Sequence, residues 1–578
     1  LLTEIFRCMF VLYHASQDTV GDVWDMQEWQ PEKVKLNIIQ NSIYGVDIER
    51  GAVDIARLRF WLSLIVDERE PHALPNLDYK IVVGNSLVSK LDDEVIDIDW
   101  EVKAGAQSNA FGIANVERRK ALLQAISAKQ KVYFNPTCDK DTIGHDIRNL
   151  KIDLLINQLE EMINTQGVES QPTGTGRTFT QQTERYLKTL GWKQSILKLE
   201  GIKTVHDSQL HFFDWKLDFP EVMNEQVAEK VGFDIVIGNP PYGAELKKDE
   251  KQFIKSKYIT SQTISGIQKG SIDTFTLFIE LGHRLTIKCG NLHFIVPISV
   301  TSSDSMTGVH NLIESDCSEI RVSSYAVRPQ PVFENAVVNT SILYFKRDGT
   351  QCKMILSTKM YRKNKAFDLE NLVNNLSFID IKDYKLQGRY PKISNITEIN
   401  ILARLKKIDE KIGNLQKAFG EKIYYRTTGG RYYKVITNYS TGSTQEKYLV
   451  FESNISNSIG AILSSSLFFW YYQIYSDNLH IKLYEIESFP IPIQQLNENA
   501  INNINHLYAL YLTDIETNAN VRNTLKYANI DTFKEYKIGK SKKLIDQIDD
   551  IIGPLYGLNQ EEIDFIKNYE IEFRLQEE

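Results

Sequence analysis

Two hydrophobic periods alternate in the first part of the chain, and this rhythm predicts an α/β fold. Residues 42–48 read "SIYGVDI", a short apolar run typical of a strand. Residues 51–66 read "GAVDIARLRFWLSLIV", whose apolar side chains recur with helical spacing. Residues 79–87 read "YKIVVGNSL", a second apolar run that ends at Gly84. A strand, a helix and another strand in this order indicate a βαβ unit, and so a parallel, doubly wound sheet.

The alternation of strand and helix patterns is interrupted by a long helical segment and then resumes. From about residue 101 to residue 208 the apolar positions have helical spacing, as in "VERRKALLQAISAKQKVYF" and "IRNLKIDLLINQLEEMI", which predicts a helical insertion. The strand pattern returns at residues 233–243, "FDIVIGNPPYG". A helix is expected next, with Asp273 as its N-cap and Gly290 beyond its end, and then the strand "NLHFIVPIS".

Composition and charge limit the classes of protein that are possible. The 578 residues carry 67 Lys and Arg against 75 Asp and Glu, a net charge of −8. A nucleic-acid-binding protein with this balance must gather its positive charge locally. The five cysteines are scattered without CxxC spacing, so we expect neither disulfides nor a metal site, and a reducing cytoplasm. No apolar run is long enough to cross a bilayer, so no membrane partner is expected.

Polar side chains follow the first two predicted strands. In an open parallel sheet, ligands bind outside the carboxyl ends of the strands. Asp47 stands there as a carboxylate that can accept hydrogen bonds from ribose hydroxyls, and Ile48 offers an apolar wall for a base. Asn85 can donate to and accept from the edge of an adenine. The alternatives are that Asp47 caps the following helix and that Asn85 only forms a turn.

The third strand end carries Asn239, Pro240, Pro241 and Tyr242. The prolines lack N–H groups and stiffen the turn, which leaves carbonyl groups outside any ladder. The Asn239 amide oxygen and the Pro240 carbonyl oxygen would then accept both protons of a planar exocyclic amino group, while Tyr242 stacks on its ring. Such acceptors expose the nitrogen lone pair for attack on a methyl group, and the proton leaves afterwards, so positioning carries the catalysis. The alternative is a strand-end turn without chemistry.

These motifs resemble a known family. NPPY after an apolar strand is similar to the catalytic motif of amino-group S-adenosylmethionine methyltransferases. The longer words "IYGVDIERGAVDIARLRFWLSL", "IVVGNSL", "FFDWKLDFP" and "GFDIVIGNPPYG" are more specific. They resemble the adenine-N6 DNA methyltransferases of the Eco57I-like type II (IIG) restriction–modification group, in which modification and target recognition share one chain. The resemblance extends in order over almost the whole sequence.

The resemblance assigns roles residue by residue. It implies that Asp47 holds the ribose of S-adenosylmethionine, that Ile48 and Asn85 hold its adenine, and that Asn239, Pro240, Pro241 and Tyr242 take the target adenine of double-stranded DNA. "PVFENAVVNTSILYF" is similar to a later family motif, which implies that Phe333 stacks on the flipped base opposite Tyr242; the alternative is a core aromatic. The base must leave the duplex to reach this pocket.

The sequence departs from the family pattern in two places. Many relatives have Asp where this chain has Asn85, which leaves the hydrogen bond possible but uncharged. The glycine-rich motif that holds the methionine end of the cosubstrate is missing, and the chain opens at Leu1 with "LLTEIFRCMFVLYH", which reads as the middle of an amphipathic helix. We therefore expect that the chain is truncated at its N-terminus and that it binds the cosubstrate poorly. The missing N-terminal segment of the same protein would be its partner. Any nuclease domain would lie in that segment.

A basic and aromatic stretch is the candidate for reading DNA. In "KIYYRTTGGRYYKVITNYSTGSTQEKYLVF" the cations interleave with tyrosines around a Gly-Gly turn. The candidate DNA-binding residues are Lys422, Arg426, Arg431 and Lys434. The alternative is a tyrosine-rich hairpin packed on its neighbours. The aromatic run "LFFWYY" further on is expected to be core rather than contact surface.

The sequence therefore predicts a DNA adenine-N6 methyltransferase, the modification and specificity part of a type II restriction–modification protein. Residues 1–350 would form the Rossmann-like methyltransferase domain with its insertion at 101–208, residues 351–500 an α+β target-recognition domain, and residues 501–578 a helical region. Two alternatives stay open: a non-catalytic DNA-binding specificity module, and an enzyme that methylates an amine of RNA or a glutamine side chain.

Overall fold

The computed structural model describes residues 31–66, 73–91, 93–101, 110–205, 210–333, 337–363, 369–428, 434–523 and 532–572. The chain divides into two compact units. Unit 1 comprises Leu1–Phe233 and Glu245–Lys257, and unit 2 comprises Asp234–Ala244 and Tyr258–Glu578. Unit 1 therefore carries the predicted βαβ stretch and the helical insertion, whereas unit 2 carries the NPPY motif and the C-terminal half.

The predicted βαβ stretch of unit 1 is confirmed. Strand β1 (Gly45–Asp47) pairs in parallel with β2 (Ile81–Val83), and α3 (Arg50–Ile65) connects them. The register places Asp47 opposite Val83, so both strands end at the same edge. Helix α2 (Pro31–Ser42) contacts α3. The strands are shorter than the apolar runs suggested.

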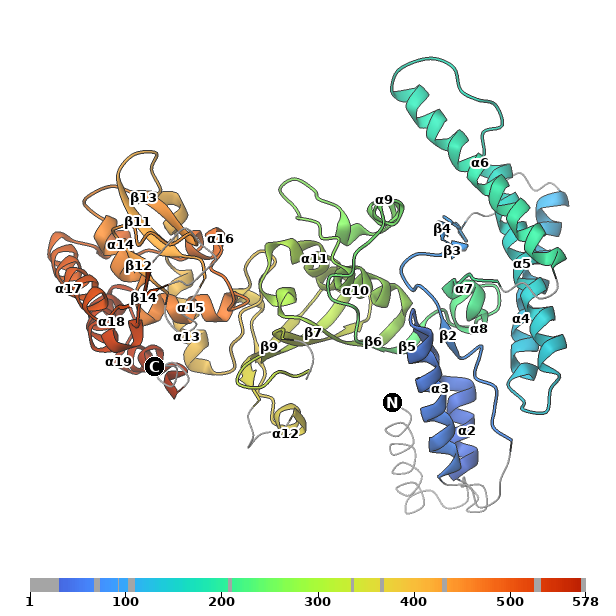
Figure 1. Cartoon of the computed structure of the whole chain (residues 1–578), viewed down its shortest axis with the longest axis horizontal. Coiled ribbons are helices and arrows are strands. Elements are labelled where there is room, and N and C mark those ends of the chain that lie inside the picture. The colour runs from blue at the N-terminus through green and yellow to red at the C-terminus, as the bar shows by residue number, and fades with distance from the viewer. Residues whose placement is uncertain are drawn as a thin grey trace. The chain divides into compact units, whose positions relative to one another are not determined.

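Three long helices form the predicted insertion. They are α4 (Ala110–Tyr133), α5 (Lys140–Gln166) and α6 (Arg177–Thr204), and α5 contacts both of the others (Figure 1). Asp139 caps α5 by accepting a hydrogen bond from the Thr142 amide. Leu123, Ile152 and Leu199 are fully buried in the core of these helices. The other described elements of unit 1 are β3 (Lys90–Leu91), β4 (Glu94–Val95), α7 (Trp215–Asp218), α8 (Pro220–Met223) and α9 (Lys248–Lys257).

A mixed six-stranded sheet forms the centre of the first part of unit 2. Its strand order is β10-β9-β7-β8-β6-β5. The strands are β5 (Phe233–Gly238), β6 (Thr286–Pro297), β7 (Cys317–Ala326), β8 (Thr340–Arg347), β9 (Met354–Arg362) and β10 (Ile379–Asp380). Strand β8 is antiparallel to β6 and β7, whereas β7 and β9 are parallel. The expectation of a parallel sheet therefore holds only in part, and the chain is a mixed α/β protein.

The helix predicted between Asp273 and Gly290 is shorter than expected. Helix α10 (Thr274–Leu285) passes directly into β6, so residues 286–290 belong to a strand. The reason is tertiary, because Gly290 pairs with Arg347 of β8 and the Arg347 guanidinium donates to the Thr286 carbonyl oxygen at 2.6 Å. Asp273 precedes the helix, but its side chain makes no capping hydrogen bond. Both α10 and α11 (Thr307–Asp316) contact strands of the sheet.

The rest of unit 2 shares one hydrophobic core with the sheet. It contains a three-stranded sheet in the order β12-β11-β13 and several helices. These elements are α12 (Leu369–Asn374), α13 (Ile396–Lys406), β11 (Glu421–Arg426), β12 (Ile436–Thr437), β13 (Glu446–Phe451), α14 (Ser456–Leu463), α15 (Ser466–Tyr475), α16 (Leu483–Glu487), α17 (Glu498–Thr517), α18 (Lys542–Leu555) and α19 (Gln560–Asn568). The aromatic run of α15 is buried, which confirms that it is core.

The tail beyond residue 501 is helical, but it also contains a hairpin. Strands β14 (Asn520–Asn523) and β15 (Thr532–Glu535) pair antiparallel between α17 and α18. One hydrophobic core contains residues from both sides of positions 350 and 500. The domain boundaries proposed at these positions stay predictions. Within the described ranges, none of the helices combines the length and apolar composition that crossing a bilayer requires.

Candidate active site and DNA-reading surface

The ends of β1 and β2 bring three predicted site residues together in unit 1. Asp47 is the last residue of β1 and is exposed, and its Oδ1 accepts a hydrogen bond from the Glu49 amide at 2.8 Å. Its other carboxylate oxygen has no partner among the described residues. Ile48 follows with 65% of its surface exposed. An open carboxylate oxygen beside an exposed apolar side chain suits a sugar and a base.

Asn85 lies beyond the end of β2 and is half-buried. Its amide oxygen accepts hydrogen bonds from the backbone N–H groups of Leu87 at 3.0 Å and Val88 at 3.2 Å. This is the turn-forming role that the sequence left open as the alternative. Only its amino group remains to meet a ligand, so Asn85 could donate to a base edge but not also accept from it.

The NPPY motif forms a tied turn in unit 2. It follows β5, which is an edge strand of the six-stranded sheet. Asn239 is exposed and Pro240 is buried. Neither the Asn239 amide oxygen nor the Pro240 carbonyl oxygen accepts a hydrogen bond from the part of the chain that the structure describes. Within the described ranges, both predicted acceptors therefore lack a hydrogen-bond donor.

Thr274 holds this turn from the start of α10. Its hydroxyl donates to the carbonyl oxygen of Pro241 at 2.7 Å and accepts from the amide of Ala244 at 3.3 Å. Thr274 is buried, with 2% of its surface exposed. The sequence analysis missed this residue, because a threonine at the start of a helix is common and gives no sign of a partner 33 residues earlier.

Tyr242 is fixed by its hydroxyl and leaves its ring half-buried. The hydroxyl donates to the carbonyl oxygen of Ile295 on β6 at 3.2 Å. Burial raises the pKa of Tyr242 to about 12, so the phenol stays protonated at any physiological pH. The residue is therefore anchored as a neutral aromatic face.

Phe333 is half-buried in unit 2, directly before residues outside the described ranges. Its ring makes no contact with the ring of Tyr242 among the described residues. Stacking of both rings on one base stays a prediction. Asp47, Ile48 and Asn85 belong to unit 1, whereas the NPPY motif and Phe333 belong to unit 2.

The predicted DNA-binding cations have three different environments. Lys422 on β11 is exposed, with its ammonium 4.2 Å from the centre of the Tyr448 ring. Arg426 ends the same strand and is half-buried. Its guanidinium donates to Thr441 at 3.0 Å and to the Lys534 carbonyl oxygen at 3.2 Å. Arg426 thus joins β11 to its neighbours, while Lys422 is free to meet a phosphate.

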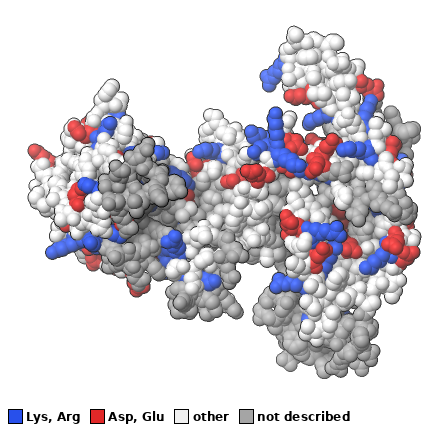
Figure 2. All heavy atoms as spheres, in the orientation of Figure 1, with Lys and Arg blue, Asp and Glu red and all other residues white. Residues whose placement is uncertain are grey.

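Lys434 lies inside the protein. It is 6% exposed, its ammonium is 4.6 Å from the centre of the Tyr472 ring, and burial lowers its pKa to about 8. This burial argues against the phosphate contact that the sequence suggested. Arg431 lies outside the described residues. On the face drawn in Figure 2, the described Lys and Arg side chains lie among Asp and Glu in small groups.

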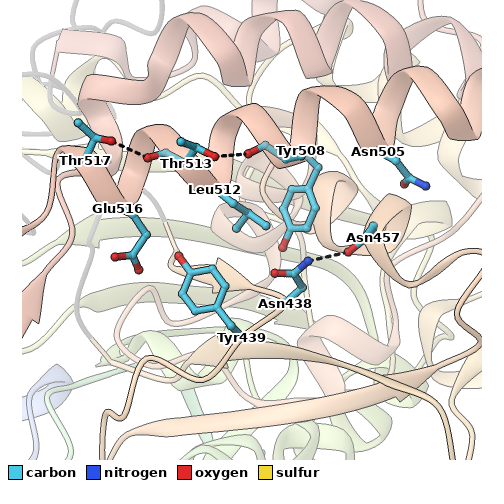
Figure 3. A pocket seen from close by; sticks show the side chains of 10 residues that line it. Asn438, Tyr439, Asn457, Asn505, Tyr508, Leu512, Thr513, Glu516 and Thr517 are labelled. Atoms are coloured by element: carbon cyan, nitrogen blue, oxygen red, sulfur yellow. Dashed lines mark hydrogen bonds between the residues drawn. The ribbon is translucent and has the colours of Figure 1, made fainter.

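A hollow that the sequence did not predict lies beside this three-stranded sheet (Figure 3). Its volume is about 620 Å³, and it is lined from α14, α17 and the residues after β12. Asn438 donates to Asn457 across it at 2.9 Å, and Tyr508 donates to the Ile436 carbonyl oxygen at 3.3 Å. The lining residues are Asn438, Tyr439, Asn457, Asn505, Tyr508, Ala509, Leu512, Thr513, Glu516 and Thr517. Amide side chains of this kind can read base edges, and segments distant in sequence supply them.

Unit 1 has a smaller hollow of about 210 Å³ at the opposite ends of its strands. Tyr44 and Lys80 line it and directly precede β1 and β2. Tyr44 donates to Glu221 at 3.0 Å. This hollow is distinct from the edge that carries Asp47 and Asn85.

Comparison with known proteins adds a family and relatives. The model of the Eco57I restriction-modification methylase family matches residues 41–333. The protein RM.MjaORFECS2P of Methanocaldococcus jannaschii, named as a type II restriction enzyme and methyltransferase, is 27% identical over 420 residues. The match covers 69% of this chain and 33% of that protein, so this chain spans about one third of its relative.

Solved structures with some likeness include two restriction enzymes. The type IIL restriction-modification enzyme MmeI, solved in complex with DNA, shares 11% identity, with 88% of this chain and 80% of that chain covered and a TM-score of 0.36. The type IIG restriction endonuclease BpuSI shares 9% identity, with 81% and 78% covered and a TM-score of 0.23.

Proposed function

The chain belongs to the Eco57I restriction-modification methylase family, and from this premise we propose that it transfers a methyl group from S-adenosylmethionine to the N6 amino group of an adenine in double-stranded DNA. It would be the modification and specificity part of a type II restriction–modification enzyme. The observation that carries the proposal is the NPPY turn, in which two acceptor oxygens have no donor among the described residues and an aromatic ring is anchored.

The residues of unit 1 fit S-adenosylmethionine. The open oxygen of Asp47 suits the ribose hydroxyls, the exposed side chain of Ile48 suits the face of the adenine, and the amino group of Asn85 suits an acceptor on its edge. When bound, this cosubstrate supplies an electrophilic methyl group. The chain's own part is to hold it by these three side chains.

The NPPY turn of unit 2 would hold the amino group. The Asn239 amide oxygen and the Pro240 carbonyl oxygen each accept one of its N–H bonds, which orients the nitrogen lone pair. Neither group is a strong base, so the turn acts by position and by its dipoles, and the surplus proton leaves to solvent. The tie from Thr274 to Pro241 keeps the turn rigid while this occurs.

An adenine in a duplex cannot reach such a turn. We propose that the base is flipped out of the stack and that its ring lies against Tyr242, with Phe333 on the other face. Flipping costs a few kcal/mol of stacking and pairing, and stacking on aromatic side chains recovers about 1–3 kcal/mol for each base.

Reading of the DNA sequence belongs to the C-terminal half in this proposal. Residues 1–350 would be the Rossmann-like methyltransferase domain, residues 351–500 the target-recognition domain and residues 501–578 a C-terminal helical region. Among the predicted cations that the structure describes, Lys422 is the exposed one and is the candidate for a phosphate, and Arg431 is a candidate for a guanine edge. Arg426 would position β11 rather than touch DNA.

Methyl-transfer assays test the proposal. The protein is incubated with radiolabelled S-adenosylmethionine and with DNA, RNA or a glutamine-containing protein, and the modified nucleoside or residue is identified. We expect N6-methyladenine in DNA. Methylation of RNA or glutamine would replace the proposed substrate, and sequence-specific DNA binding without transfer would instead favour a specificity module.

A variant pair tests the acceptor residues. Asn239→Ala removes one of the two acceptors and should abolish transfer while DNA affinity stays largely intact. Asn414→Ala is the matched control, because Asn414 is an exposed asparagine elsewhere in unit 2. Full activity of Asn239→Ala would refute the assignment of the acceptor pair.

A further inference from the structure

The segment between α9 and α10 is a loop with a firmly held base. Glu280 of α10 is 1% exposed and accepts hydrogen bonds from the amides of Ile259 at 3.0 Å and Thr260 at 2.8 Å. It also accepts one from the Thr260 hydroxyl at 2.7 Å. A buried carboxylate that receives three such bonds fixes the start of the loop.

The two arms of the loop are bonded to each other up to its tip. The Ser271 amide donates to the Thr260 carbonyl oxygen at 3.0 Å, and the Gly270 amide donates to the Thr263 hydroxyl at 3.1 Å. Ile264 and Gln268 exchange backbone hydrogen bonds of 3.0 and 2.9 Å.

The turn and the interior of the loop are also fixed. Gly266 turns the chain with φ of +73°, a conformation that favours glycine. The buried side chain of Gln268 donates to the carbonyl oxygens of Ile259 and Gln262 at 2.9 and 2.6 Å. The loop is therefore a narrow, internally bonded hairpin.

This hairpin places two isoleucines in solvent. Residues 262–267 are all exposed, and among them Ile264 and Ile267 show 40% and 60% of their surface. The hairpin's own bonds hold its backbone, so these side chains cannot fold back into a core. Residues 259–272 contain one Lys and no Asp or Glu, in a chain with 75 acidic residues. An apolar tip without negative charge can approach a phosphate backbone without repulsion.

The far end of the hairpin is tied to the NPPY turn. It runs through Asp273 into Thr274, the residue that bonds to both Pro241 and Ala244. The tip and the turn therefore share one frame within unit 2. A duplex held with its adenine at the turn would lie next to the base of this hairpin.

We propose that Ile264 and Ile267 form an apolar wedge that enters the base stack of the duplex and fills the space left by the flipped adenine. This inference rests on the proposed function and deepens it. Apolar side chains inserted between base steps lower the cost of unstacking, since they cover ring faces that would otherwise meet water. The partner of the exposed tip is thus the interior of the DNA stack.

The test compares two isoleucines of similar exposure. Ile267→Ser alters the wedge, and Ile396→Ser is the matched control at 65% exposure on α13. The modified adenine is first mapped by sequencing DNA that the unaltered protein has methylated. Transfer is then measured on a matched duplex and on one with an abasic site opposite that adenine, which is easier to flip.

We expect Ile267→Ser to lose about tenfold in transfer to the matched duplex and to regain the rate on the abasic duplex, because the wedge acts on flipping. The double variant Ile264→Ser/Ile267→Ser should lose more, and Ile396→Ser should match the unaltered protein. With 2-aminopurine at the target position, the fluorescence rise on binding should shrink in the wedge variants.

The outcomes separate the wedge from the proposed function. Equal transfer by Ile267→Ser and the control on the matched duplex overturns the wedge alone. A loss of transfer that the abasic duplex does not restore also overturns the wedge. That result would indicate that the tip contacts another protein or stabilises the fold. If the unaltered protein methylates no DNA, the proposed function fails and the wedge with it.

Discussion

The hydroxyl of Thr274 donates a 2.7 Å hydrogen bond to the carbonyl oxygen of Pro241, and this bond joins the first residue of α10 to the NPPY turn. The Thr274 hydroxyl oxygen also accepts a hydrogen bond from the amide of Ala244, two residues beyond the motif. A rigid turn is what positional catalysis requires, because a shift of about 1 Å at the reacting group can cost about a hundredfold in rate.

Thr274→Val should therefore lower kcat for methyl transfer by about 10–100-fold with a smaller effect on KM, since it loosens the turn without touching the DNA. Thr274→Ser keeps the hydroxyl and should retain most of the activity. Steady-state kinetics with DNA and S-adenosylmethionine provide the check. A fully active Thr274→Val variant would show that the bond is structural only.

Tyr242 should contribute its ring more than its hydroxyl. Tyr242→Phe loses one hydrogen bond to Ile295 and should cost less than about tenfold in rate, because such a bond is worth about 1 kcal/mol. Tyr242→Ala also loses the stacking face and should cost about 10–100-fold. Because the pKa of Tyr242 is raised to about 12, neither difference should change between pH 7 and pH 9. A rate that falls between pH 7 and pH 9 in the parent protein but not in Tyr242→Phe would contradict the raised pKa of Tyr242.

Lys422 and Lys434 should differ in their effect on DNA binding. Lys422→Ala should weaken binding to all sequences and reduce the slope of log K against log salt by about one, as expected for the loss of one phosphate contact. Lys434→Met should leave both quantities unchanged, since Lys434 is buried. Fluorescence anisotropy over a salt series measures both variants, and equal losses would show that the buried lysine is exposed on binding.

Lys434→Met should also change stability with pH. Burial lowers the pKa of Lys434 from its ordinary 10.5 to about 8. Below pH 8 the buried lysine is charged, and the full cost of burying that charge is subtracted from the stability of the fold. That cost fades as the pH rises from about 8 towards 10.5. The gain in stability of Lys434→Met over the parent should therefore be larger at pH 7 than at pH 10 in urea unfolding. An equal gain at both values would mean that the lysine does not titrate in this range.

Glu398 predicts the opposite trend with pH. It is buried, bonded to the Ser394 amide and the Trp470 indole, and burial raises its pKa from 4.5 to about 7. A carboxyl with a raised folded pKa stabilises the fold below its unfolded pKa and loses that contribution as the pH rises through about 7. The free energy of unfolding of Glu398→Gln, relative to that of the parent, should therefore rise by about 1–3 kcal/mol as the pH increases from 5 to 8. A difference that is the same at both pH values would argue against a neutral Glu398.

The sequence by itself determined the features that lie within one short segment. Each of Asp47, Asn85 and Asn239 directly follows an apolar run, so the strand and the polar end could be read together. The βαβ order and the helices of the insertion followed from local periodicity, and the aromatic run of α15 was recognised as core from its composition. Such patterns persist in the fold because burial of apolar faces selects them.

Only the tertiary structure decided which side chains are already bonded or buried, and which residues they contact. The oxygen of Asn85 is taken by its own turn, Lys434 is covered by Tyr472, and β6 begins at Thr286 because β8 lies beside it. Thr274 gained its role from a partner 33 residues away. These facts depend on contacts between distant segments, and periodicity carries no information about which segments will meet.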